Sequence, residues 1–80
     1  MPDVETRLVG CFLTVFPDLS EADIRLASQE RLEHWDSVAA ITLVNVIEEE
    51  FSTQIDYDHL PNLDTFAKVL DYLTVDRGLS

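Results

Sequence analysis

The segment EHWDSVAA, residues 33–40, brings together the residue types of nucleophilic catalysis. His34 stands three residues before Ser37, and Asp36 stands directly beside that serine. A catalytic serine needs a base that is held by a third group, together with an oxyanion hole, and closeness in sequence does not provide that geometry. We therefore expect no catalytic residue here and do not expect the chain to be an enzyme in its own right.

Ser37 has a second chemical possibility, because a long apolar-periodic run without glycine or proline follows it. The N-terminus of a helix favours negative charge, since its first N–H groups are unpaired and the helix dipole adds to their effect. A serine at that position can carry a phosphodiester. An Asp-Ser pair before an apolar run is also an ordinary helix cap, and from Asp36 and Ser37 alone the cap is the better interpretation.

Metal binding is not predicted. The segment DYDHLPNLD offers several carboxylates, but a calcium loop that began at Asp56 would need glycine at its sixth position and glutamate at its twelfth. Pro61 and Ala67 occupy those positions. His34 and His59 are isolated histidines without a third ligand at a useful spacing.

The cysteine usage and the N-terminal sequence favour a cytoplasmic protein. Cys11 is the single cysteine, so no disulfide can form within the chain, and its place on an apolar helix stripe predicts a buried, unreactive thiol. The first residues, MPDVETRL, carry acids where a signal peptide would need a basic start. No apolar run approaches the roughly 20 residues that span a bilayer.

Length and charge limit the classes of function. Eighty residues suit one domain, 1–80, and 46% hydrophobic residues with two glycines and three prolines indicate a globular chain. Sixteen acids against five Lys and Arg give a net charge of −11, which excludes nucleic acid and a bare membrane as partners. This charge either steers the domain toward basic patches on other proteins or simply keeps it soluble.

Three stretches have helical periodicity. Residues 3–16 place one apolar stripe at this spacing: Val4, Leu8, Cys11, Phe12 and Val15. Residues 37–51, capped by Asp36 or Ser37, should turn these side chains inward: Ile41, Val44, Ile47 and Phe51, with Leu43 on the flank. A last helix over about residues 64–75, capped by Asp64 or Asn62, should bury Phe66, Val69, Leu70 and Leu73.

Residues 17–36 lack sustained periodicity, and a connection of that length is uncommon in a small domain. The segment SEADIRLA can form a turn of helix, since Ser20 and Asp23 suit a helix start. The following apolar side chains should pin the connection to the core: Leu19, Ile24, Leu26, Leu32 and Trp35. The predicted fold class is all-α, a small three-to-four-helix bundle with a long loop between helices 1 and 2.

The segment WDSVAAITLVNVIEEEFSTQID, followed by LDTFAKVLDYL, resembles the second half of an acyl carrier protein. That family has Asp-Ser-Leu at the start of its second helix, where this chain has Asp36, Ser37 and Val38, and residues 48–51 match the acidic close of that helix. The resemblance implies that a phosphopantetheinyl transferase attaches a 4′-phosphopantetheine arm from coenzyme A to Ser37. The thiol of the arm would hold an acyl group as a thioester, Asp36 would assist the transferase through its metal, and Val38 would flank the arm.

The resemblance also implies a surface for partners. Its expected residues are Trp35, Ala39, Thr42, Asn45, Glu48 and Glu49. The expected partners are an acyl or aminoacyl ligase, a synthase or an acyltransferase with a basic docking patch, acting on a monomer. Fatty-acid members of the family usually carry acids at the positions of Ala39 and Thr42, and an apolar residue where Asn45 stands. A stand-alone, specialised carrier therefore fits better than the general carrier of fatty acid biosynthesis and lipid metabolism.

Two alternatives remain open. An aminoacyl or peptidyl carrier of a nonribosomal-type pathway would share the fold and the arm but would load an amino acid. An unmodified acidic helical interaction module would use Ser37 only as a cap.

Overall fold

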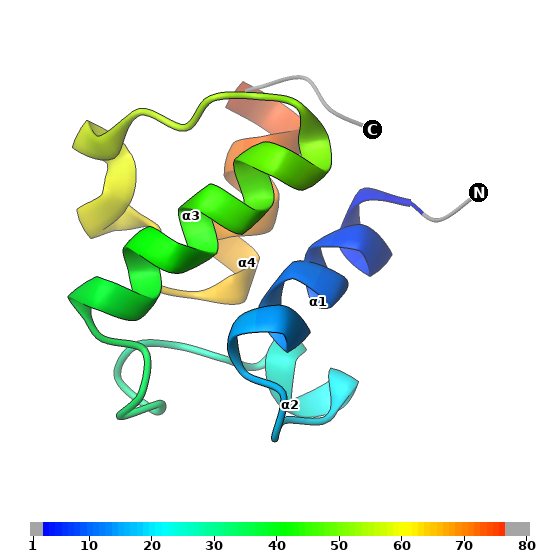
Figure 1. Cartoon of the computed structure of the whole chain (residues 1–80), viewed down its shortest axis with the longest axis vertical. Helices are drawn as coiled ribbons and strands as arrows, with labels where there is room; N and C mark the ends of the chain where they lie inside the picture. Colours follow the sequence, from blue (N-terminus) through cyan, green and yellow to red (C-terminus); the bar gives the residue numbers. More distant parts are fainter. Residues whose placement is uncertain (1–2, 77–80) are drawn as a thin grey trace.

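The computed structural model describes residues 3–76, and these residues form an all-α bundle (Figure 1). The elements are α1 (Val4–Val15), α2 (Glu21–Arg25), α3 (Ser37–Phe51), a 3-10 helix η1 (Tyr57–Asn62), α4 (Phe66–Asp71) and a π-helical turn η2 (Tyr72–Asp76). Over this range no β-strand is present, and a single antiparallel bridge joins Ser28 to Thr65. The predicted fold class is confirmed.

Polar side chains cap the N-terminal ends of the α-helices. Each accepts a hydrogen bond from a backbone N–H three residues further on: Asp3 for α1, Ser20 for α2, Asp36 for α3 and Thr65 for α4. The expected cap of the last helix, Asp64 or Asn62, is therefore wrong by one to three positions. The Asp64 carboxylate instead pairs with the Lys68 ammonium at 3.0 Å.

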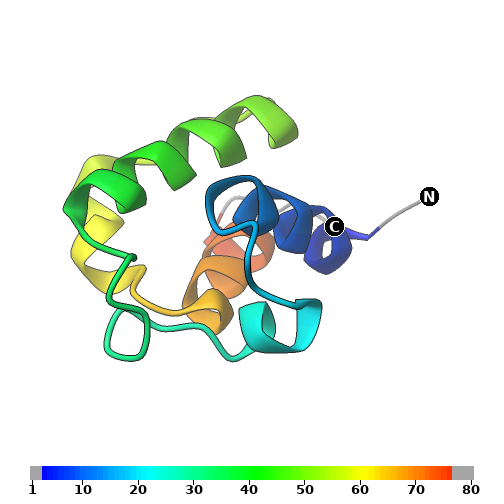
Figure 2. The same ribbon diagram turned by 60° about the horizontal axis from the view of Figure 1, so that its bottom comes forward.

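The bundle is built around the contact between α1 and α3. In Figures 1 and 2, α3 crosses the molecule along one side, α1 packs against it, and α4 lies behind and contacts α1. α2 lies at one end and contacts both α1 and α4. The largest side chains that this packing removes from water are Leu8, Phe12, Ile24, Ile47 and Leu73.

An aromatic cluster holds the long connection to the core. The Phe12 ring centroid lies 5.3 Å from that of Trp35 and 5.2 Å from that of Phe66, both edge-to-face. Ile24 is also fully buried, so two of the expected anchors of the connection are confirmed. Leu26 was a wrong choice, because it is 67% exposed. It follows Ile24 by two residues at the end of a helical turn, so it points to the opposite side.

Backbone hydrogen bonds fasten the second half of the same connection to the start of α4. The Gln29 N–H donates to the Asp64 carbonyl at 2.8 Å, and the Phe66 N–H donates to the Ala27 carbonyl at 3.0 Å. These bonds flank the Ser28–Thr65 bridge. The segment that leads into α3 is therefore held both by buried side chains and by backbone hydrogen bonds.

The buried face of α3 differs from the predicted one in a single important side chain. Ile41 is 46% exposed, whereas the face turned to the core consists of Ala40, Leu43, Val44, Ile47 and Phe51. α3 is apolar almost all round between residues 38 and 47, so periodicity alone does not define its inner stripe. The position of α1 selects the stripe, and Ile41 then faces solvent.

Candidate functional site

The start of α3 separates the capping residue from the serine. Asp36 Oδ1 accepts a hydrogen bond from the Ala39 N–H at 2.9 Å, and the Asp36 carbonyl accepts one from the Ala40 N–H at 2.9 Å. Ser37 is the first residue of the helix and its side chain is exposed. Within residues 3–76, no hydrogen bond involves its hydroxyl. The hydroxyl is thus available to a reagent from outside.

The surroundings of Ser37 suit a phosphodiester. The first N–H groups of a helix have no carbonyl partner within it, and they point toward an anion placed at the helix start. The first turn of α3 contains no acid besides the capping Asp36. The exposed hydroxyl and the N-terminal end of a helix of 15 residues therefore fit the attachment of a phosphate-linked arm.

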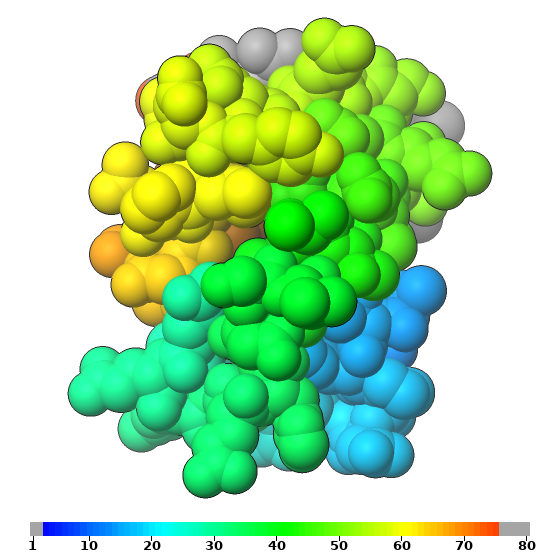
Figure 3. Space-filling view, turned by 60° about the vertical axis from the view of Figure 1, so that its left-hand side comes forward, coloured from blue at the N-terminus to red at the C-terminus, as the bar shows by residue number. Residues whose placement is uncertain are grey.

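The face of α3 beside Ser37 is uncharged and partly apolar. Val38 is 73% exposed, and the exposed Ile41 lies one turn after Ser37. Thr42 and Asn45 are exposed on the same helix, and Ala39 is half-buried. Figure 3 shows this side of the molecule, where α3 (green) runs beside η1 (yellow). Sequence reasoning missed Ile41, although its spacing of three from Val38 and four from Ser37 was a usable signal.

Trp35 does not belong to this surface, which corrects its expected role in partner recognition. It is only 3% exposed and packs edge-to-face on Phe12. Its Nε1–H is buried and finds no hydrogen-bond acceptor within the described residues. A tryptophan two residues before the serine therefore serves as a core anchor, because the loop that carries it folds back over α1.

The acidic triplet at the end of α3 consists of Glu48, Glu49 and Glu50, and two of its carboxylates bind other groups of the same chain. Glu48 Oε2 accepts a hydrogen bond from the Ile55 N–H at 2.8 Å, which holds the chain after the helix. Glu50 Oε2 pairs with Arg7 Nε at 2.8 Å, and the Glu50 carbonyl accepts a bond from Arg7 Nη2 at 2.6 Å. Among the described residues, Glu49 makes no ion pair and is exposed.

The titratable groups outside this site form no metal centre in the described part of the chain. Over residues 3–76, no group of three or more His, Cys, Asp or Glu side chains could hold a metal ion. Cys11 is buried, and this burial raises the pKa of its thiol to about 11, with a further contribution from the Glu50 carboxylate. Cys11 therefore stays a neutral thiol at physiological pH, as expected for a core residue.

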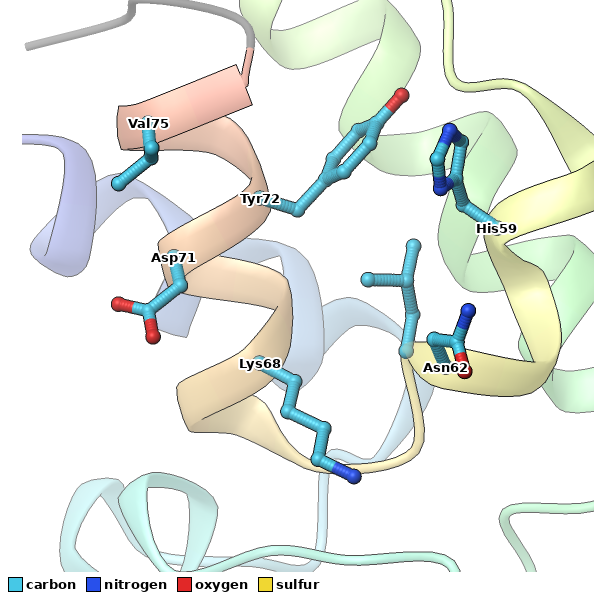
Figure 4. Close-up of a pocket in the computed structure, with 7 residues that line it drawn as sticks. His59, Asn62, Lys68, Asp71, Tyr72 and Val75 are labelled. Atoms are coloured by element: carbon cyan, nitrogen blue, oxygen red, sulfur yellow. The ribbon is translucent and has the colours of Figure 1, made fainter.

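A groove of about 570 Å³ lies between η1 and the segment formed by α4 and η2 (Figure 4). The His59 and Tyr72 rings, which both line it, lie side by side with centroids 5.2 Å apart and their planes tilted by 48°, and Lys68 lies at one end. Lys68 is already paired with Asp64, and no residue of α3 lines the groove.

Comparison with known proteins identifies the family of the chain. Acyl carrier protein 2 of Pseudomonas aeruginosa is 34% identical to the chain over 74 residues, which cover 91% of this chain and 92% of that protein. The chain belongs to the acyl carrier protein family, and this membership supports a carrier role in general. No family model and no solved structure matches the chain significantly. No helix within the described range is long and apolar enough to cross a membrane.

Proposed function

We propose that this chain is a non-enzymatic carrier that holds acyl intermediates as thioesters on a 4′-phosphopantetheine arm at Ser37. Its partners are a phosphopantetheinyl transferase, which attaches the arm, and cytoplasmic biosynthetic enzymes that load and unload the acyl group. The arm, once attached, supplies a terminal thiol for the thioester. Family membership supports the class of function, and the neutral face of α3 favours a specialised pathway over general fatty acid synthesis.

The observation that carries this proposal is the free Ser37 hydroxyl. In an interaction module the serine would be needed only as a cap, but the Asp36 carboxylate already caps α3 through the Ala39 N–H. A serine that is exposed, uncommitted and at the start of a helix has no structural duty in residues 3–76. The reactivity of its hydroxyl therefore supports a role for Ser37 in attachment of the arm.

In the transfer reaction, Ser37 Oγ forms a bond to the phosphorus of coenzyme A that bears the pantetheine. The bond from this phosphorus to the bridging oxygen breaks, and adenosine 3′,5′-bisphosphate leaves. The hydroxyl proton passes to a base of the transferase. Asp36 would assist the transferase through its metal while its Oδ1 keeps the helix cap, and Val38 would flank the arm.

The test is the intact mass of the protein after incubation with coenzyme A, magnesium and a broad-specificity phosphopantetheinyl transferase. We expect a gain of one phosphopantetheine on the wild type and no gain on Ser37→Ala. Ser52→Ala is the control. It should gain the arm like the wild type, because Ser52 lies at the opposite end of α3 from Ser37.

A folded wild-type sample that gains no mass with several transferases would refute the carrier proposal. It would return the chain to the class of acidic interaction modules. If loading succeeds, the holo-protein can be offered to acyl and aminoacyl ligases in parallel. Transfer of an amino acid in place of an acyl group would identify a peptidyl-type carrier.

A further inference from the structure

A small apolar pocket lies between the end of α1 and the loop that leads into α3. Its volume is about 240 Å³. In the lower part of Figure 3 these two segments meet, the end of α1 in blue and the loop in green. Asp18 and His34 line the pocket, and the rest of its lining is apolar: Val15, Phe16, Pro17, Leu19 and Leu32. Neither the helix cap nor the modification of Ser37 accounts for such a pocket.

The walls of this pocket are held by the core. The Phe16 ring is 8% exposed, and its centroid lies 6.1 Å from that of Trp35 and 6.3 Å from that of Phe12. On the loop side, the Leu32 carbonyl accepts a hydrogen bond from the Trp35 N–H at 3.0 Å. Because both walls are already in place, a ligand binds there without the entropy cost of ordering them.

Ser37 lies close to this pocket. His34 precedes it by three residues, so their Cα atoms are at most about 11 Å apart, the span of a fully extended chain. In the arm that we propose at Ser37, the pantoyl group follows the phosphate directly. One oxygen and one methylene separate the phosphorus from a carbon that bears two methyl groups. The most compact apolar part of the arm is therefore tethered near the pocket.

We propose that the pantoyl group of the arm rests in this pocket, with its two methyl groups against Leu19 and Leu32. The inference rests on the proposed carrier function and adds to it a resting site for the arm. The His34 imidazole has both a hydrogen-bond donor and an acceptor, which suits the hydroxyl and amide groups beside the methyl groups. Beyond the phosphate the arm is uncharged, so the net charge of −11 does not oppose its binding.

A second pocket of about 170 Å³ extends the apolar surface along the loop. It shares Leu19 and Leu32 with the first pocket and adds Leu26, whose side chain is 67% exposed. Arg31 and Asp23 provide polar groups at this second pocket. Contact between the arm and Leu26 is favourable, because it removes apolar surface from water. The two pockets thus give the uncharged arm a surface to lie on when no enzyme holds it.

The test is a filtered NOE measurement by NMR on the holo-protein. The chain is labelled with ¹³C and ¹⁵N, and the arm is attached from unlabelled coenzyme A, with intact mass confirming the attachment. We expect NOEs from the pantoyl methyl groups to Leu19 and Leu32. The methyl resonances should also move upfield from their positions in free pantetheine, because the Phe16 ring lines the pocket.

Two substitutions of an aliphatic residue by asparagine separate the pocket from the helix surface. Leu19→Asn changes a residue that lines both pockets and should abolish the NOEs to Leu32. Ile41→Asn is the matched control and should leave these NOEs unchanged, because Ile41 is 46% exposed on α3 and lines neither pocket. His34→Ala, at an exposed residue outside the core, should weaken the NOEs while the fold stays intact.

NOEs from the pantoyl methyl groups to Val38 and Ile41 alone would overturn the inference and place the arm along α3. Methyl resonances like those of free pantetheine, without NOEs to the chain, would overturn it in favour of an arm that stays in solvent. The same follows if Leu19→Asn keeps the NOEs to Leu32. In each of these cases the protein is loaded, so the gain in mass still supports the carrier function. A folded wild type that gains no arm overturns the carrier function, and the resting site fails with it.

Discussion

Asp36 and Ser37 are neighbours in sequence with opposite duties at the start of α3. The Asp36 carboxylate is turned to the backbone and caps the helix at 2.9 Å from the Ala39 nitrogen, whereas the Ser37 hydroxyl is turned to solvent without a partner in the described residues. Capping fixes the first turn, so the serine is presented from a rigid helix start. The arrangement separates the residue that caps the helix from the residue at which we propose that the arm is attached.

This separation predicts unequal effects of two alanine substitutions on the free energy of unfolding. Asp36→Ala should lower it by about 1 kcal/mol, because the Ala39 N–H loses its acceptor. Ser37→Ala should change it by less than about 0.5 kcal/mol, as for an exposed residue without a structural contact. Urea unfolding followed by far-UV circular dichroism gives both values.

Asp36→Asn is the matched control for this pair, since asparagine also caps helices well and should retain most of the stability. The assignment of the cap is wrong if Ser37→Ala costs as much stability as Asp36→Ala.

Arg7 is the polar link between α1 and the end of α3. Its guanidinium donates to the Glu50 carboxylate and carbonyl, and it lies 4.5 Å above the Phe51 ring centroid. Arg7→Ala should lower the free energy of unfolding by about 1–2 kcal/mol, because charge-assisted hydrogen bonds and a cation–π contact are lost together. Chemical denaturation of the two proteins side by side measures the difference.

Arg25→Ala is the control for Arg7, because it removes ion pairs to Glu5 and Glu21 at 3.6 and 3.5 Å that are largely exposed. Pairs of this kind contribute about 0–1 kcal/mol. Equal losses for the two variants would mean that the Arg7 contacts act as an ordinary surface pair.

Burial of Trp35 predicts a stability effect that a surface residue would not have. Trp35→Ala should lower the free energy of unfolding by about 3–5 kcal/mol, the usual range for a large aromatic residue in a core. Trp35→Phe should cost about 1 kcal/mol or less, because it keeps a ring against Phe12 and deletes a buried N–H that lacks an acceptor. Thermal and urea unfolding distinguish the two; a near-neutral Trp35→Ala would place the indole at the surface.

Burial of Cys11 predicts a pH dependence at alkaline pH. The pKa of the thiol is raised from 9.0 to about 11 in the folded protein, so the unfolded chain loses the proton first. The stabilisation from the neutral thiol is fully present below pH 9 and is lost as the pH rises toward 11. Urea unfolding across this interval should show a steeper fall for the wild type than for Cys11→Ala, which lacks the titrating group. Parallel curves would contradict the assignment.

The sequence alone determined the helical class and the position of α3, and it singled out Ser37 as the candidate for modification. These features depend on local properties: the spacing of Leu8, Cys11 and Phe12 in the first helix, and a polar cap before an unbroken apolar run in the second. α3 was predicted over residues 37–51 and runs over Ser37–Phe51. A helix cap bonds to a backbone N–H only three residues further on, so it can be recognised from local sequence. Asp36 was accordingly named as one of the two candidate caps.

Only the tertiary structure decided which side chains of α3 are inside. Its middle is apolar on nearly all sides, so the exposure of Ile41 depends on where α1 packs, and the burial of Trp35 depends on a loop that returns to Phe12. The sequence also could not predict that Glu50 pairs with Arg7, because the two residues are 43 positions apart in the chain. Local periodicity defines an element, whereas the direction in which each residue faces is set by contacts between elements that are distant in sequence.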